Sequence, residues 1–258
     1  MTLPLVHAVW IGRSLGPIHA ACLRSFVRSG HNVTLHVYEE PTDAPDGIVL
    51  SDAGELFPAS RVSEFKGMAV VADLIRYEIL ARGLGLYVDC DVYCLRPLED
   101  SPFILGWEND GVVNNAILKL PHDHPMVRDL CRLGERAFVP PWLSRAQQNR
   151  LRFMAMVGRP VGIERMRSGT TSPRAVTWYA KAHGIEAEVR PSDVLYPVPP
   201  QRASMLVDPD LTIQDLITKR TRYLHLYYGM LKPLDLSRPP KGSPLDCMIR
   251  DEIAVADD

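Results

Sequence analysis

The feature of the sequence that most constrains the fold is an alternation of strand and helix patterns over the first ninety residues. Apolar runs at 5–11 and 84–88, and a segment at 33–38 that alternates apolar and polar residues, are typical of strands. Two segments with helical spacing, 17–30 and 67–82, separate these strands. This order predicts an α/β fold with a mainly parallel sheet, flanked by helices and joined by right-handed crossovers.

The rest of the chain is less regular and richer in proline. Most of the 22 prolines follow residue 90, which predicts frequent loops between short elements. Strand patterns occur at 104–107, 112–118 and 223–228, and helical patterns at 125–138 and 172–183. We therefore expect one domain over 1–258, with a sheet half at 1–110, a loop-rich half at 111–235 and a loose tail at 236–258.

Composition excludes several classes of protein. The chain has 258 residues, of which 46% are hydrophobic and 23% charged, as in soluble globular proteins rather than disordered or fibrous ones. Its formal net charge of −2 argues against nucleic-acid binding by broad phosphate neutralisation. The sequence has no run of roughly 18 apolar residues, the length that a membrane span needs. Five scattered cysteines and no basic residue before Arg13 favour a reducing cytoplasm over secretion.

Two carboxylates follow the third predicted strand. Asp89 and Asp91 stand two positions apart, and residues with this spacing share one face of an extended chain. Oxygen ligands on one face suit Mg²⁺ or Mn²⁺. In parallel sheets, ligands also bind beyond the carboxyl ends of the strands, where Gly12 and Asp89 both lie. The triplet D-x-D is common in proteins, so the alternative is a turn whose two aspartates are simply solvated.

The helical segment before this strand carries a second charged pair. Asp73 and Arg76 lie about 60° apart around a helix, while Leu74 and Ile75 lie on a different arc that suits core packing. The alternative is a solvent-exposed ion pair, which would contribute only a few tenths of a kcal/mol.

The order and spacing of these residues resemble the DXD-motif glycosyltransferases, and above all glycosyltransferase family 32 with its relatives among the clostridial glucosylating toxins. The similar segments are 6–12, 72–77, 83–91, 114–116 and 124–125. The resemblance is dense over 5–125 and thin beyond. It implies a GT-A fold, a divalent cation (Mn²⁺ or Mg²⁺), and a nucleotide-sugar donor bound by 1–110, with the acceptor bound by 111–235.

The resemblance also implies roles for individual residues. Trp10 would stack on the nucleotide base, with Ile11 and Gly12 lining the same pocket. The alternative for Trp10 is a core aromatic, and we expect His7 to be a hydrogen-bonded core imidazole. Asp73 and Arg76 would hold hydroxyls of the donor sugar. Asp89 would contact the ribose or a metal-bound water, and Asp91 would ligate the metal directly.

A late segment, 225–233, is similar to the H-x-x-G-x-x-K-P element of the related family 8 transferases, with one more residue between the histidine and Gly229. In that element the histidine is the third metal ligand and the lysine contacts the diphosphate. We therefore expect His225 to complete the metal site, because imidazole with carboxylate suits Mn²⁺, and Lys232 to contact the donor. A structural histidine and an exposed lysine are the alternatives.

The implied reaction moves a hexose to a hydroxyl group with retention of configuration. A UDP-sugar is the favoured donor, with GDP-mannose second. The acceptor would be a glycan, a lipid-linked sugar or a protein. Asn114, Asn115, Gly169 and Thr170 are candidate sugar or acceptor contacts, although such residues are often simple turn formers. We expect a cytoplasmic protein, or one peripheral at the inner face of a membrane.

Two other functions fit parts of the pattern. Asp89 and Asp91 after a strand also fit a Mg²⁺-dependent phosphohydrolase of the haloacid dehalogenase type, although the strand comes late in the chain and Tyr93 stands where Thr or Val is usual. The second alternative is a non-catalytic module that binds nucleotide sugars.

Overall fold

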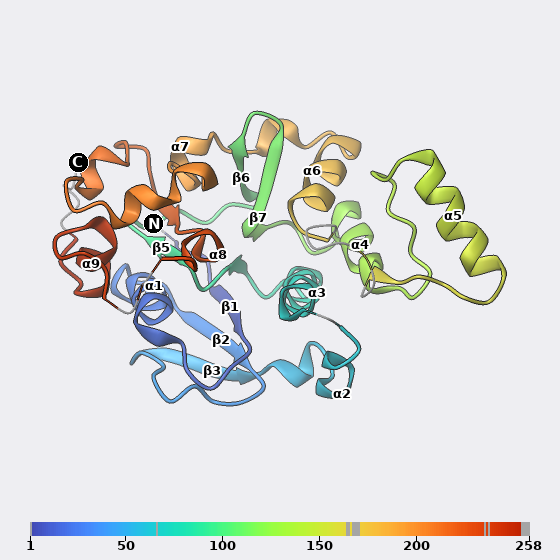
Figure 1. The fold of residues 1–258 in the computed structure, drawn as a ribbon, viewed down its shortest axis with the longest axis horizontal. Helices are drawn as coiled ribbons and strands as arrows, with labels where there is room; N and C mark the ends of the chain where they lie inside the picture. Colours follow the sequence, from blue (N-terminus) through green and yellow to red (C-terminus); the bar gives the residue numbers. More distant parts are fainter. Residues whose placement is uncertain are drawn as a thin grey trace.

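The computed structural model describes residues 2–65, 67–163, 166, 171–234, 236 and 238–253. Its centre is a six-stranded sheet with the order β3-β2-β1-β4-β7-β6 (Figure 1). The strands are β1 (Val6–Trp10), β2 (Val33–Val37), β3 (Ile48–Asp52), β4 (Leu86–Val88), β6 (Ile104–Asn109) and β7 (Val112–Lys119). The strands from β3 to β4 run parallel, while β7 pairs antiparallel with β4 and β6. The predicted α/β class and mainly parallel sheet are confirmed.

Helices cover both faces of the sheet and bury two apolar clusters. One face is covered by α1 (Gly16–Arg28), whose residues Ile18, Leu23 and Phe26 belong to the first cluster. The second cluster, on the other face, is formed with α3 (Met68–Ala81), α4 (Pro125–Cys131) and α6 (Pro173–Ala182). Among the described residues, no helix is both long enough and apolar enough to span a bilayer.

A separate two-stranded ribbon joins distant parts of the chain. It pairs β5 (Val92–Cys94) with β8 (Tyr223–His225) in antiparallel register, with Val92 opposite His225. Because β5 begins directly after Asp91, this pairing carries His225 to the carboxyl end of β4.

Several elements differ from the sequence-based expectation. Strand β3 was not predicted, because it follows β2 through a loop rather than a helix. The helix expected at 125–138 ends at Cys131 and continues as a short 3₁₀ turn. The strand expected at 223–228 ends at His225, because Tyr227 adopts a left-handed φ of 51° before α8 (Tyr228–Leu231). The remaining α-helices are α2 (Ala59–Val62), α5 (Arg145–Met156), α7 (Ser192–Leu195) and α9 (Pro244–Ile249).

The tail predicted to be loose at 236–258 contains a packed helix, so that prediction is wrong for α9. Ser243 caps the helix by accepting a hydrogen bond from the Asp246 amide, and Pro244 occupies its first turn. Leu245 and Met248 are buried in the cluster that also holds α1. Two prolines at 239–240 signal a break in the chain, but they say nothing about the apolar helix that follows.

Candidate metal and donor site

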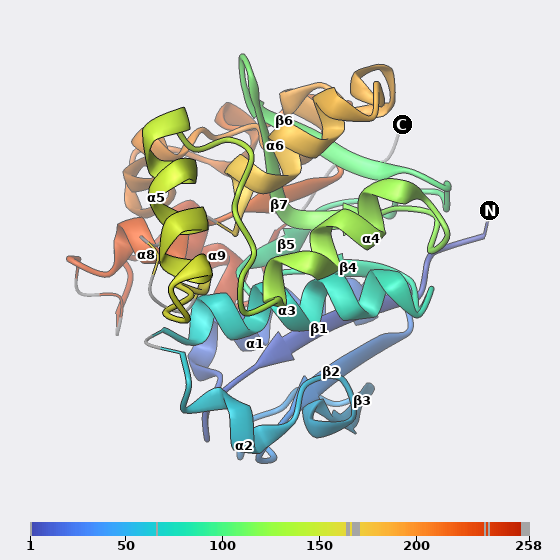
Figure 2. The ribbon, with the colours of Figure 1, turned by 90° about the vertical axis from the view of Figure 1, so that its right-hand side faces the viewer.

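The predicted site residues lie at the end of the sheet toward which the parallel strands point. Asp89 directly follows β4, and its amide donates to the Ala116 carbonyl at 2.8 Å, which fixes the chain as it leaves the sheet. Figure 2 shows that α8 and the first turn of α3 lie on the side to which β1 points. Cys90 is buried between the two aspartates and its thiol contacts the Val9 carbonyl, so the carboxylates of Asp89 and Asp91 face the same region.

Asp89, Asp91 and His225 form the one group of metal-ligating side chains found among the described residues. One ligand atom from each lies within 4.8 Å of the others. The segment after β8 holds Asp91 from two directions, because the Leu226 amide donates to its carbonyl and the Tyr228 amide donates to its Oδ2, both at 2.9 Å. The three residues predicted as metal ligands are therefore brought together.

The charges of this group are strongly coupled. Burial raises the pKa of Asp91, but His225 Nε2 lies 3.2 Å from Asp91 Oδ1 and the net result is a pKa lowered to about 2. Burial opposes protonation of His225, yet the same contact with Asp91 raises its pKa overall. For Asp89, burial is the largest effect and raises the pKa, with Arg76 acting in the opposite direction. The contact between Asp91 and His225 therefore favours the ionised carboxylate of Asp91 and the protonated imidazole of His225.

The donor set of this group fits a divalent cation. Two carboxylates and one imidazole match the ligand preferences of Mn²⁺ and Mg²⁺ with open positions. Within the described parts of the chain, Oδ2 of Asp89 and the buried Nδ1 of His225 have no hydrogen-bond partner. The Asp89 side chain is 28% exposed, so its Oδ2 is open to solvent and to a cation. The group could thus hold a metal ion.

Arg76 lies behind the group and connects it to α3. The residue is only 3% exposed, and its guanidinium donates to Asp73 Oδ1 at 2.7 Å and to Asp89 Oδ1 at 2.6 Å. Tyr87 donates to the same Asp89 oxygen at 2.7 Å, and the Arg76 guanidinium lies 4.4 Å from its ring centre. Asp73, Arg76 and Asp89 are therefore one buried ion network, and the solvent-exposed alternative for the first two is excluded.

The carboxylate of Asp73 receives four side-chain donors. Arg76 and Asn115 donate to Oδ1, while the hydroxyls of Thr171 and Ser172 donate to Oδ2, both at 2.6 Å. The segment before α6 is thereby fastened to the helix that carries Asp73. Asn115 belongs to the same network, and the other predicted asparagine, Asn114, donates to Glu108.

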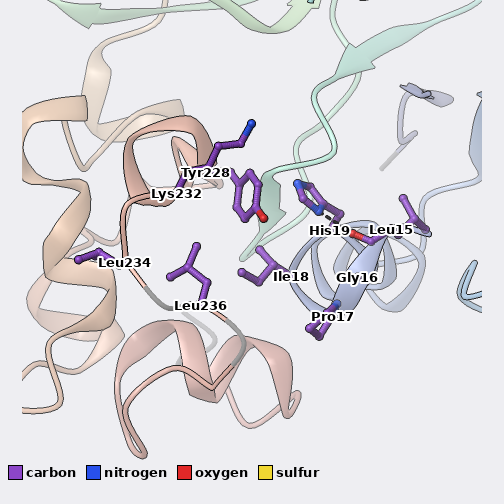
Figure 3. Close-up of a pocket in the computed structure, with 9 residues that line it drawn as sticks. All are labelled: Leu15, Gly16, Pro17, Ile18, His19, Tyr228, Lys232, Leu234 and Leu236. Atoms are coloured by element: carbon purple, nitrogen blue, oxygen red, sulfur yellow. Dashed lines mark hydrogen bonds between the residues drawn. The ribbon is translucent and has the colours of Figure 1, made fainter. Parts of the chain in front are cut away.

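A pocket of about 310 Å³ lies between α1 and α8, beside the metal-ligating group (Figure 3). Tyr228 and Lys232 face His19 across it, and the rings of His19 and Tyr228 meet edge to face at 4.5 Å. Trp10 is half-buried and packs on the other side of His19 at 4.6 Å, with its Nε1 donating to the Ser14 carbonyl. An aromatic row therefore runs from the predicted base-binding residue to the predicted diphosphate-binding lysine.

The other predicted residues have mixed surroundings. Ile11 is half-buried against the second apolar cluster, and Gly12 lies under the Trp10 ring, where an added Cβ would crowd Nε1 at 3.2 Å. His7 is a core imidazole, as predicted, with its Nε2 3.1 Å from the Leu84 carbonyl. Gly169 and Thr170 lie outside the described residues.

Sequence reasoning missed several residues of the site. His19, Tyr87, Glu108, Thr171 and Ser172 were not predicted. No local pattern marks His19 or Ser172, because their proximity to the site depends on packing between distant segments. Tyr87 shares the strand face of Asp89, and that period-2 spacing was a usable signal.

No protein-family model matches the chain, and no curated protein is similar to it in sequence. Among solved structures, the chain is similar to one titled "PaToxG Glycosyltransferase", with 12% sequence identity, a TM-score of 0.40, and coverage of 97% of this chain and 85% of that one. A similarity of this size does not indicate what the chain binds or transforms.

Proposed function

We propose that the protein is a metal-dependent glycosyltransferase of the GT-A type that moves a hexose from a nucleotide sugar to a hydroxyl acceptor. The observation that carries the proposal is the meeting of Asp89, Asp91 and His225 at the carboxyl end of β4. The sequence supports it as well, because the resemblance to glycosyltransferase family 32 implies Asp91 as a metal ligand and Asp89 near the metal, and the similarity of 225–233 to the family 8 element implies His225 as the third ligand.

In this proposal Asp91 and His225 ligate the cation and Asp89 completes its shell. The bound metal would neutralise the charge that develops on the diphosphate as the nucleotide leaves. Arg76 holds Asp89 in place and keeps its Oδ1 occupied, so that Oδ2 remains for the ligand. Lys232 lines the neighbouring pocket and is exposed, which leaves its ammonium group available to the diphosphate.

The donor would lie along the aromatic row, with its base on Trp10 and its sugar toward Asp73. A sugar hydroxyl would bind Asp73 by replacing the hydroxyl of Thr171 or Ser172, since both already donate to that carboxylate. The acceptor hydroxyl would attack from the face that the diphosphate leaves, with retention of configuration. UDP-hexose is the favoured donor, and the acceptor would be a glycan, a lipid-linked sugar or a protein, with Asn114 and Asn115 as candidate sugar or acceptor contacts.

The proposal is tested by nucleotide release from a panel of nucleotide sugars, with and without Mn²⁺. We expect hydrolysis of one donor, UDP-linked in the first instance, to require the metal. Asp91→Asn should lower the rate at least 100-fold, because it removes a charged ligand from the site. The matched control is Asp210→Asn, which changes an exposed loop aspartate and should leave the rate unchanged.

Three results would contradict the proposal in different ways. Unchanged hydrolysis in Asp91→Asn would place the reaction elsewhere in the molecule. Release of phosphate from simple phosphomonoesters would favour the phosphohydrolase. Binding of a nucleotide sugar, seen as a rise in melting temperature, without turnover of any donor would favour a binding module.

A further inference from the structure

Helix α5 stands apart from the body of the molecule and presents an apolar row on its outer side. Figures 1 and 2 show it projecting beyond α3 and α4. None of its residues is buried, while Phe153, Met156 and the following Val157 are 56%, 76% and 49% exposed. These are three of the nine large apolar side chains that are exposed among the described residues, and here they are adjacent.

The helix is held by local contacts that leave this row free. Ser144 and Gln147 form a capping box at its start, and Gly158 ends it with a φ of +73°. The Gln148 amide donates to the carbonyls of Pro141 and Leu143, which fastens the helix to the preceding loop. The half-buried residues of α5 occupy the face opposite the apolar row; they are Gln148, Leu151, Met154 and Ala155.

Arginines border the apolar row on both sides. Successive residues of a helix are rotated by about 100° around its axis, so the side chains of Phe153, Met156 and Val157 cover an arc of about 100° on the surface of α5. Around the helix, Arg145 and Arg152 lie next to this arc on the side of Met156, and Arg150 lies next to it on the side of Val157. Within the described parts of the chain, none of these three arginines forms an ion pair with an acidic residue.

The surrounding segment has the same one-sided charge. Between Glu135 and Glu164 the sequence contains five arginines and no acidic residue; they are Arg136, Arg145, Arg150, Arg152 and Arg159. The whole chain carries a net charge of −2, so this positive region is a local departure from the composition of the protein. Figure 2 shows that α5 reaches the same side of the molecule as α8 and the start of α3.

We propose that α5 is a docking helix for a membrane surface that contains anionic lipid. The apolar row would enter the boundary between head groups and acyl chains, and the arginines on either side would pair with lipid phosphates and carboxylates. Guanidinium groups on long stems suit this position, because the stem can lie along apolar surface while the charge stays in the polar layer.

The charge pattern is the reason to favour a lipid surface as the occupant. A row of three apolar side chains with cations on both edges, in a segment without acidic residues from 136 to 163, matches a continuous anionic layer. A protein partner is the competing occupant, and the experiment below separates the two.

The experiment is co-sedimentation of the full chain with vesicles of phosphatidylcholine alone or with 30% phosphatidylserine. We expect binding only to the anionic vesicles, and weaker binding at higher salt because screening shortens the range of the attraction. The double variant R145Q/R150Q should lower the affinity about 30-fold, at about 1 kcal/mol for each charge. Phe153→Ser combined with Met156→Ser should abolish the binding at the same lipid concentration.

Matched variants elsewhere on the surface serve as controls. R61Q/R82Q removes two charges from α2 and the end of α3, and Trp178→Ser removes an exposed aromatic residue from α6. Both should bind anionic vesicles as the unaltered chain does. Absence of vesicle binding, equal binding to neutral vesicles, or equal losses in the control variants would overturn the proposal. The readout is the bound fraction, so this result is independent of the proposed catalytic activity.

Discussion

Arg76 is the residue that connects the helix, the sheet and the candidate site. Its charge is buried and is balanced by Asp73 on one side and Asp89 on the other. Burial disfavours the charged guanidinium, yet the two aspartates and Tyr87 raise its pKa further above its ordinary value. A buried charge with this many partners is costly to leave incomplete.

Removal of this guanidinium should therefore destabilise the whole fold. Arg76→Met keeps much of the side-chain volume but leaves two carboxylates near one another without a cation, and we expect the free energy of unfolding to fall by about 3–5 kcal/mol. Arg82→Met, which breaks an exposed pair with Glu78, should cost less than about 1 kcal/mol. Urea denaturation of both variants measures the difference. A loss of stability in Arg76→Met as small as that in Arg82→Met would show that the buried network contributes little.

At this scale, the sequence predicts residues whose position follows from local geometry. Asp89 and Asp91 could be predicted as neighbours because one residue separates them, although they stand in a turn, where the Val92 amide donates to the Asp89 carbonyl at 3.0 Å, and not on an extended strand. His225 was assigned by resemblance, because only the pairing of β5 with β8 brings it to Asp91. Thr171 and Ser172 could not be predicted, since their contact with Asp73 depends on how α6 packs against α3.

Among the elements, the turn between α3 and β4 depends on a glycine that has no substitute. Gly85 has a φ of +152°, and an added Cβ would overlap the Leu5 carbonyl oxygen, which accepts the hydrogen bond from the Leu86 amide. The chain therefore approaches β1 so closely that any side chain would separate the two strands.

Gly85→Ala should lower the free energy of unfolding by about 2–4 kcal/mol, because backbone strain and the steric overlap both act at this position. The matched control is Gly67→Ala, at a site where an added Cβ meets no atom within 4 Å and φ is −147°. It should change stability by no more than about 0.5 kcal/mol. Thermal unfolding of the pair measures this, and equal stability of the two variants would contradict the predicted overlap.

Helices and strands whose apolar residues recur with a regular spacing, and which have a glycine or proline near their ends, could be predicted from the sequence. Elements that are fixed by tertiary packing could not. Helices α1 and α3 begin and end within one or two residues of the expected positions. Strand β3 is only half-buried and has no helix before it, so its pattern is weak. Helix α9 is short, and only its packing on the first cluster gives it stability.

On the scale of the whole molecule, two stacked histidines make stability depend on pH. His7 Nδ1 lies 3.0 Å from His36 Nε2 inside the sheet. Burial, and to a smaller degree His7, lowers the pKa of His36 to about 4. The unfolded chain takes up this proton near pH 6.5, so the contribution of His36 to stability is present above pH 6.5. It is lost as the pH falls from 6.5 to about 4, and the full loss is about 3 kcal/mol.

This dependence is measured by urea denaturation between pH 7.5 and pH 4.5. The variant His36→Gln should be less stable at neutral pH but should lose less stability on acidification than the unaltered chain. His122→Gln changes an exposed histidine and should leave the slope as it is. A slope that is the same in all three proteins would assign the acid sensitivity to other groups.

The ribbon of β5 and β8 has a consequence for how the molecule is made. The two aspartates are synthesised early and the imidazole late, and nothing before β8 can bring that ring to its partners. A nascent chain that has folded β1 to β7 on the ribosome holds two ligands without the third. In the metal-dependent enzyme proposed above, binding of a cation by all three groups would therefore wait until β8 has left the exit tunnel.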